Sequence, residues 1–234
     1  MTRHNRTLAC LLAVMVSMAV ASSGPVAWAA RQKLAVSRIF FEYNASANDL
    51  GVHVSLDGEN WEQLSIINPR GTSLFEVEGR SPFATLGLTE LLFEGAEPNL
   101  DEFPLDDLLR LFPAGTYQFS GRTVGGEIIE GTGTLTHAIP AGPKVSATVG
   151  PGNRLVILWT AVTGPPPGFP NRRITIAGYQ VIIGSFQVTV PAKTLKVTVP
   201  PEFVASLPSG SHQFEVLAIE ASGNQTITEG TFTK

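Results

Sequence analysis

Cysteine is nearly absent from this chain: the only one among its 234 residues is Cys10, close to the N-terminus. Everything that follows Cys10 lacks a thiol, which excludes disulfide bonds, thiolate metal ligands and cysteine catalysis there. Stability has to come from burial of a hydrophobic core. Basic residues are also in deficit, with 16 Lys and Arg against 20 Asp and Glu. Because nucleic acids and anionic membranes are bound through positive patches, neither is expected as a partner.

Long hydrophobic runs are missing as well, apart from Leu8–Val20, which is too short to span a bilayer comfortably. Arg3 and Arg6 precede this run, and a small-x-small sequence (AWA) follows it at 27–29. This order predicts a signal peptide over residues 1–29, cleaved after the second of these alanines, and the lone cysteine would be discarded with it. Removal leaves 14 basic and 20 acidic residues, a net charge of −6. We expect an exported protein, periplasmic or secreted, with no membrane span.

One stretch of the sequence occurs twice without a gap. Leu105–Phe119 (LDDLLRLFPAGTYQF) returns 95 residues later as Pro200–Phe214 (PPEFVASLPSGSHQF). Each copy predicts a short helical turn, a Pro-x-Gly turn and an alternating strand. The period is close to the length of one small β-sandwich, about 100 residues, so we predict an all-β chain with two sandwiches in tandem, residues 31–139 and 143–234. The identical pairs are Pro113/Pro208, Gly115/Gly210, Gln118/Gln213 and Phe119/Phe214.

The N-terminal part shows the turn rhythm of an antiparallel sheet. In Gly51–Leu56 apolar and polar residues alternate, and His53 belongs to the outward face. Asp57-Gly58 is a hairpin signal, after which Trp61 would lie half exposed on the returning strand. Residues 87–112 break the rhythm and predict a short helical insertion. The expected elements are strands Ala35–Tyr43, Gly51–Leu56, Trp61–Ile67, Ser73–Val77, Thr116–Arg122 and Ile128–His137, and helices Leu88–Phe93 and Leu105–Leu111.

The C-terminal part follows a short Pro-containing linker, Ile139–Pro143 (IPAGP), whose composition favours a fixed or limited hinge. Seven strands are expected after it, the number in a constant-type immunoglobulin-like sandwich. They are Val145–Val149, Arg154–Thr160, Ala177–Ile183, Phe186–Val190, Leu195–Val199, His212–Ile219 and Thr226–Phe232.

Three stretches of residues 143–234 carry a family resemblance. Trp159 in LVILWTAV, Tyr179 in IAGYQVII and the sequence LPSGSHQFEVLAI together resemble a fibronectin type III domain. The resemblance implies a β-sandwich in which Trp159 and Tyr179 are core residues. His212 stands where that family has its corner tyrosine, and the first copy of the repeat has Tyr117 there. The repeat therefore extends the prediction of an immunoglobulin-like or fibronectin type III-like sandwich to residues 31–139. Such motifs identify a fold more than a function.

Catalysis is not expected from the histidines. Beyond the predicted signal peptide there are three, His53, His137 and His212, and none stands at a metal-ligand spacing from another. A Gly-x-Ser-x-Gly elbow and a P-loop are both absent from the sequence. The sequence therefore predicts a protein that is not an enzyme, with no catalytic residues, no cofactor and no assigned metal ligands.

Acidic residues gather in the region Glu90–Asp107, and carboxylate and amide oxygens are the ligands that calcium prefers. No calcium-loop pattern is recognisable, so a solvated acidic face is the alternative. A calcium site would require the melting temperature to differ between excess chelator and millimolar calcium. The acidic residues are Glu90, Glu94, Glu97, Asp101, Glu102, Asp106 and Asp107, and a second loop offers Glu42, Asn44, Asn48 and Asp49.

The loop Thr163–Arg173 (TGPPPGFPNRR) is longer than a link between two strands requires, and its prolines hold it extended. In the resembled family this loop and the last hairpin loop, here Ser222–Gln225, share one end of the sandwich and often form a binding surface. Arginine next to an aromatic residue on such a loop is typical of interfaces. The alternative is a rigid spacer loop whose Phe169 caps the core edge. The candidate binding surface is Phe169, Arg172, Arg173 and Asn224.

Three kinds of function remain open on this basis. The first is a non-catalytic exported binding module for a protein partner or a surface glycan. The second is a structural spacer in an envelope or extracellular assembly. Less favoured are a calcium-dependent carbohydrate-binding module, a two-domain periplasmic chaperone and an enzyme. The sequence specifies neither the ligand nor the oligomeric state.

Overall fold

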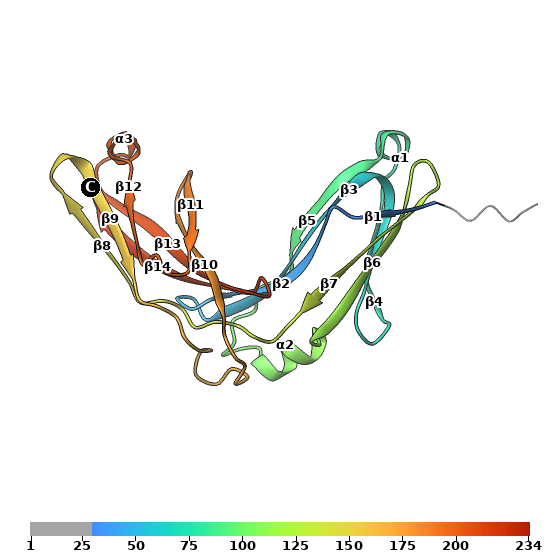
Figure 1. Ribbon diagram of the computed structural model, residues 1–234, viewed down its shortest axis with the longest axis horizontal. Helices are drawn as coiled ribbons and strands as arrows, with labels where there is room; N and C mark the ends of the chain where they lie inside the picture. Colours follow the sequence, from blue (N-terminus) through green and yellow to red (C-terminus); the bar gives the residue numbers. More distant parts are fainter. Residues whose placement is uncertain (1–29) are drawn as a thin grey trace, which may run out of the picture.

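The computed structural model describes residues 30–234, so the predicted signal peptide, residues 1–29, lies outside the described residues. The described chain is all-β, with fourteen strands and three short α-helices, which confirms the expected fold class. Figure 1 shows a bent molecule in which two β-rich halves rise from a common joint. We refer to residues 31–139 as the N-terminal half and to residues 143–234 as the C-terminal half. Among the described helices, none has the length and apolar character that a membrane crossing requires.

The N-terminal half is built around one long strand, β3 (Asp49–Ile67). Its other elements are β1 (Arg31–Lys33), β2 (Val36–Asn44), β4 (Ser73–Glu78), α1 (Pro82–Leu86), β5 (Leu88–Glu94), α2 (Leu105–Leu111), β6 (Gly115–Thr123) and β7 (Ile128–Leu135). The first part of β3 pairs with β2 and β5, and its second part with β6 and β4. One strand thus pairs with four others around a single hydrophobic core.

The predicted hairpin at Asp57-Gly58 is wrong, because the chain continues beyond it as β3, with an irregular pairing register between Asp57 and Trp61 and a φ of 47° at Asn60. Asp57 is paired on both sides, with Val36 and with Glu90. The glycine serves close packing instead of a turn: a Cβ at Gly58 would lie 2.6 Å from the Ile129 Cδ1 atom. Since no hairpin forms, Trp61 is not half exposed; it is 1% exposed and belongs to the core.

The second correction concerns Leu88–Phe93, which was expected to be helical and is strand β5. Its residues have helix-forming propensity, but β3 offers a free edge along which β5 forms a ladder. Pairing and burial override local propensity there, with Leu91 and Phe93 packed against the core. The predicted helix Leu105–Leu111 is confirmed as α2, with Leu108 and Leu109 buried.

The C-terminal half contains all seven expected strands. They are β8 (Val145–Gly150), β9 (Arg154–Trp159), β10 (Ile176–Ile183), β11 (Phe186–Pro191), β12 (Lys196–Val199), β13 (Ser211–Glu220) and β14 (Gln225–Thr233), with a 3-10 turn (Pro151–Asn153) and α3 (Pro201–Ser206). Strands β12, β9 and β8 form one sheet, and β14, β13, β10 and β11 lie in the other. Trp159 and Tyr179 are core residues as expected, with ring centroids 5.5 Å apart. This is a fibronectin type III-like sandwich.

The internal repeat has a structural counterpart at the start of β6 and of β13. Tyr117 Oη donates to the Pro113 carbonyl oxygen at 3.1 Å. In the second copy, His212 Nε2 lies 2.8 Å from the Pro208 carbonyl oxygen. In each case an aromatic polar group reaches the carbonyl four residues earlier, so histidine takes over the corner role of tyrosine.

The two halves are joined through their sheets. Strand β14 pairs in parallel with β2, with Thr226 opposite Tyr43, so a sheet path continues from one half into the other. The predicted linker, Ile139–Pro143, is part of this joint: Ile139 is fully buried, and the Pro140 carbonyl oxygen accepts a hydrogen bond from Thr226 Oγ1 at 2.5 Å. A buried, hydrogen-bonded linker holds the halves in one arrangement.

Candidate functional site

The predicted binding surface divides into exposed and packed residues. Arg172 and Arg173 are exposed, as a binding role would require. Phe169 is half-buried and packs on Tyr43 of the N-terminal half, with ring centroids 4.8 Å apart. Its contact fits the alternative in which this aromatic ring caps a core edge. This contact also attaches the loop Thr163–Arg173 to the N-terminal half, next to the pairing of β2 with β14.

The expected position of Asn224 on this surface is wrong, because Asn224 is 1% exposed. Its side-chain amide donates to the carbonyl oxygens of Thr136 and Ala138, at 2.9 and 3.1 Å. Its Oδ1 accepts from the backbone N–H of Phe41 at 2.9 Å. Asn224 therefore connects the C-terminal half to two segments of the N-terminal half, and no partner can reach it in this arrangement.

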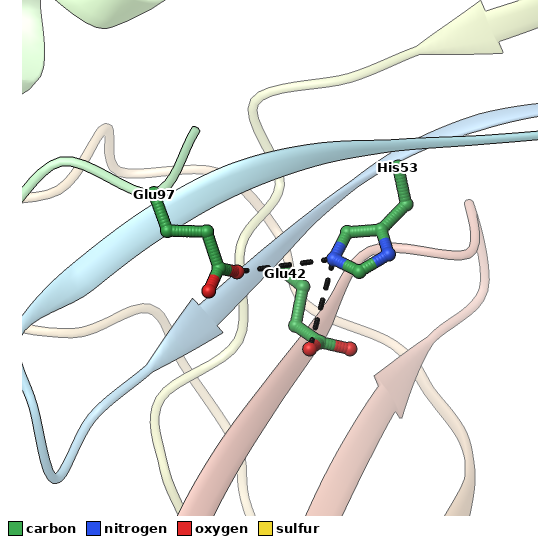
Figure 2. Close-up of side chains that lie close together, drawn as sticks. All are labelled: Glu42, His53 and Glu97. Atoms are coloured by element: carbon green, nitrogen blue, oxygen red, sulfur yellow. Dashed lines mark ion pairs between the residues drawn. The ribbon is translucent and has the colours of Figure 1, made fainter. Parts of the chain in front are cut away.

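A second group of residues lies on the outward face of β2 and β3; the sequence analysis named its members one by one but did not predict that they meet. Figure 2 shows Glu42, His53 and Glu97 pointing toward one another. His53 Nε2 lies 3.7 Å from a Glu42 oxygen and 3.8 Å from a Glu97 oxygen. One ligand atom from each of the three residues lies within 4.8 Å of the others. A fourth side chain, Glu94, places an oxygen 3.6 Å from the same nitrogen. We call these four residues the His53 cluster.

Strand register explains why the cluster forms. The alternation predicted for β3 is confirmed: Val52 and Val54 are buried in the core, and His53 faces the other way. Opposite His53 lie Phe40 on β2, whose ring stacks on the imidazole at 5.1 Å, and Glu94 on β5. These neighbours cover the outward face, so the His53 side chain is only 20% exposed.

A glycine makes room for the remaining carboxylate. Gly51 lies opposite Glu42 in the ladder between β2 and β3. A Cβ at Gly51 would lie 2.6 Å from the Glu97 Cγ atom and 2.9 Å from its Oε1. Any larger residue at position 51 would displace the Glu97 side chain from the surface of β3. The glycine therefore leaves the space that this carboxyl group occupies.

Burial and mutual repulsion shift the carboxyl groups of the cluster. Burial raises the pKa of Glu42, which the nearby His53 and a hydrogen bond from Gln225 partly oppose. The pKa of Glu97 is raised from 4.5 to about 8, first by burial and then by hydrogen bonding to Glu94 and the charge of that residue. Burial, followed by the charges of Glu229 and Glu94, also raises the pKa of Asp49. With this pKa, the carboxyl group of Glu97 retains a proton at neutral pH.

This pKa shift predicts how stability depends on pH in excess chelator. Between 4.5 and about 8 the folded Glu97 holds a proton that the unfolded chain has released. The stabilisation from this bound proton is complete at a pH below the pKa of Glu97 in the unfolded chain. It is lost as the pH rises through the pKa of Glu97 in the folded protein. We expect the urea concentration at half unfolding to decrease as the pH is raised from 5 to 9. In Glu97→Gln this concentration should decrease less steeply with pH. Identical slopes in the two proteins would contradict this assignment.

The two oxygen-rich segments considered for calcium do meet in the structure. Asn48 donates a side-chain hydrogen bond to Asp101 Oδ1 at 3.1 Å, and Asn99 donates one to the Ala47 carbonyl oxygen at 2.9 Å. Glu90 lies apart from them, opposite Asp57 in the sheet. The exposed acidic residues therefore do not form one site, and Asp106 and Asp107 occupy the first turn of α2.

No short motif could have revealed the His53 cluster. Its carboxylate partners are 11 positions before His53 and 41 and 44 positions after it. The other two described histidines have different surroundings, because His137 Nε2 lies 2.9 Å from the Phe112 carbonyl oxygen and His212 faces Pro208. Both of those side chains have structural partners in the backbone.

Comparison with known proteins finds no matching family model and no matching curated protein. A segment of two fibronectin type III domains from chicken tenascin aligns at 12% identity over 86% of this chain and 99% of that one, with a TM-score of 0.30. A 1.5-MDa bacterial ice-binding adhesin aligns at 14% identity over 88% of this chain and 64% of that one, with a TM-score of 0.29. The spore cortex lytic enzyme SleM of Clostridium perfringens aligns at 22% identity over 41% of this chain, with a TM-score of 0.33, and the aligned part is 28% of the enzyme. These likenesses are distant, at 22% identity or less and TM-scores of 0.33 or less.

Proposed function

We propose that this chain is an exported, non-catalytic binding module made of two β-sandwich domains, residues 31–139 and 143–234. The signal-peptide pattern supports export to the periplasm or the medium. The observation that carries the binding role is the pair Arg172 and Arg173, exposed on a loop that Phe169 pins to Tyr43. A loop held in place loses little conformational entropy when it binds, so its arginines are preorganised for a partner.

The surroundings of this loop indicate the chemistry of the partner. A cavity of about 450 Å³ lies beside the loop and is lined by residues of both halves, among them Arg70, Arg110, Asp106 and Pro170. The guanidinium of Arg70 donates to the Arg110 carbonyl oxygen at 3.3 Å, and the guanidinium of Arg110 pairs with Asp107, so the cavity itself has both charges. Guanidinium groups bind carboxylates through paired hydrogen bonds. The exposed Arg172 and Arg173 therefore favour a protein partner that presents surface carboxylates to the loop.

The structure also favours a module of fixed shape, as a structural role would need. Strand β14 adds directly to β2, and the linker residue Ile139 is fully buried, which favours a fixed arrangement of the two halves. A spacer role and a binding role both use such rigidity. Exposed arginines at the joint favour binding, because a spacer has no need of a preorganised basic loop.

A cross-linked pull-down from the envelope and secreted fractions of the host tests the proposal. The test variant is Arg172→Ala/Arg173→Ala, which leaves Phe169 and its packing on Tyr43 intact. The matched control is Lys193→Ala/Lys196→Ala, which removes the same charge from exposed positions of the C-terminal half. We expect one protein to be retained by the native chain and the lysine variant and lost by the arginine variant. Equal retention by all three would refute the arginine surface, and retention of a polysaccharide in place of a protein would assign a glycan ligand.

A further inference from the structure

The most unusual atom of the His53 cluster is the imidazole Nε2. It is shielded from solvent and has no hydrogen-bond partner. Its nearest carboxylate oxygens, on Glu42, Glu94 and Glu97, lie 3.6–3.8 Å away, beyond hydrogen-bond distance. A buried polar atom without a partner costs free energy, and such an atom in a folded protein calls for an explanation.

We propose that Glu42, His53 and Glu97 bind one divalent transition-metal ion, with Zn²⁺ as the best fit and Glu94 as a fourth ligand. Tetrahedral ligands about 2.1 Å from zinc lie about 3.4 Å from one another, close to the separations between Nε2 and the three oxygens. The site is independent of the arginine surface and goes beyond the proposed function.

The donor set decides between zinc and calcium. Calcium takes six to eight oxygen ligands, whereas an imidazole nitrogen suits zinc and other first-row transition ions. The nitrogen in this cluster lies between the carboxylates, so an ion that contacts them also contacts His53 (Figure 2). The calcium site considered from the sequence therefore gives way to a site of different chemistry, formed by three of the same acidic residues, Glu42, Glu94 and Glu97, together with His53.

Neighbouring groups hold the ligands in position, as supporting hydrogen bonds do in metal sites. Gln225 donates a side-chain hydrogen bond to Glu42 Oε2, which leaves Oε1 directed at His53. The Phe40 ring stacks on the imidazole, with an interplanar angle of 16°, and limits its rotation. Gly51 provides the space for Glu97.

The position of the site gives the ion a structural role. Glu42 lies on β2, His53 on β3, and Glu97 in the segment after β5, so one ion would tie three segments of the N-terminal half. Gln225 is the first residue of β14 and lies opposite Glu42 in the pairing that joins the halves. An ion bound to Glu42 therefore reinforces the joint through a single hydrogen bond.

Isothermal titration calorimetry with Zn²⁺ and with Ca²⁺ tests the site. The protein is purified without a polyhistidine tag and stripped with chelator before titration. The test variants are His53→Gln and Glu97→Gln. The matched controls are His212→Gln, whose imidazole faces a backbone carbonyl, and Glu102→Gln, an exposed carboxylate outside the cluster. Co²⁺ serves as a second probe, since its visible absorption is strong in a tetrahedral site and weak in an octahedral one.

We expect one Zn²⁺ per chain, bound at least about tenfold more tightly than Ca²⁺. Each cluster variant should weaken Zn²⁺ binding by at least about tenfold, and each control should leave it within about twofold. Circular dichroism in chelator checks that the variants fold, and Glu97→Gln carries the test if His53→Gln does not. Zinc affinity unchanged in a folded cluster variant, tighter binding of Ca²⁺, or no binding of Zn²⁺ would each overturn the proposal.

Discussion

Replacing Trp61 with alanine is expected to destabilise the protein by about 3–5 kcal/mol, the range for removing a buried aromatic side chain. Trp61 lies where the pairing of β3 changes from β5 to β6: it is opposite Leu88 of β5 and opposite Thr123 of β6. Its indole fills the core, so alanine would leave a cavity there. For a chain of this size the melting temperature should fall by about 2–4 °C per kcal/mol.

Trp61→Phe is the matched control for this substitution. The indole Nε1 has no hydrogen-bond partner in the structure, so a phenyl ring gives up volume but no hydrogen bond. We expect Trp61→Phe to cost less than half as much as Trp61→Ala. Thermal unfolding followed by far-UV circular dichroism measures both. A change in Trp61→Ala within about 0.5 kcal/mol would instead support the hairpin with an exposed tryptophan that the sequence suggested.

Replacing Asn224 with alanine should have the second-largest effect, about 3 kcal/mol or more. The substitution removes one acceptor and two donors from a buried position, and it leaves the Phe41 N–H and the Thr136 and Ala138 carbonyls without their partner. Each buried group left unpaired costs about 1–3 kcal/mol. Because these bonds cross between the halves, the loss should also loosen the joint, which limited proteolysis near Ile139–Pro143 would report as faster cleavage.

Two control variants test whether the loss of stability comes from the buried position of the Asn224 amide and not from the loss of an asparagine as such. Asn171→Ala alters an exposed asparagine on the Thr163–Arg173 loop and should change stability by less than about 0.5 kcal/mol. Asn224→Asp keeps the acceptor for Phe41 but places carboxylate charge against two carbonyl oxygens, so it should destabilise at least as much as alanine. If Asn224→Ala behaves like Asn171→Ala, the amide does not hold the joint.

The joint connects the separate findings on this molecule. Asn224 and Thr226 bind the linker and the end of β7, Phe169 packs on Tyr43, and the His53 cluster lies beside the pairing of β2 with β14. The exposed arginines belong to the same region. A partner bound at the arginine loop would therefore contact a part of the molecule whose geometry both halves maintain.

Local patterns in the chain were sufficient to predict much of the fold. Alternation with period two predicted the seven strands of the C-terminal half and the core positions Val52 and Val54. The repeat predicted α2 and the corner at which Tyr117 and His212 play equivalent parts. These features depend on neighbours within a few residues, and a single sequence contains that information.

The features that the sequence did not predict depend on contacts between residues far apart in the chain. Gly58 carries a turn signal, but a strand forms there because Ile129 and Leu34 occupy the space of its missing side chain. Leu88–Glu94 is a strand because β3 presents an open edge, and Asn224 is buried because β14 joins β2. His53 acquires its carboxylate neighbours only when β2, β3 and β5 align. Sequence periodicity shows which way a side chain points on its own strand, but the partner it meets there depends on long-range pairing, which local propensity does not encode.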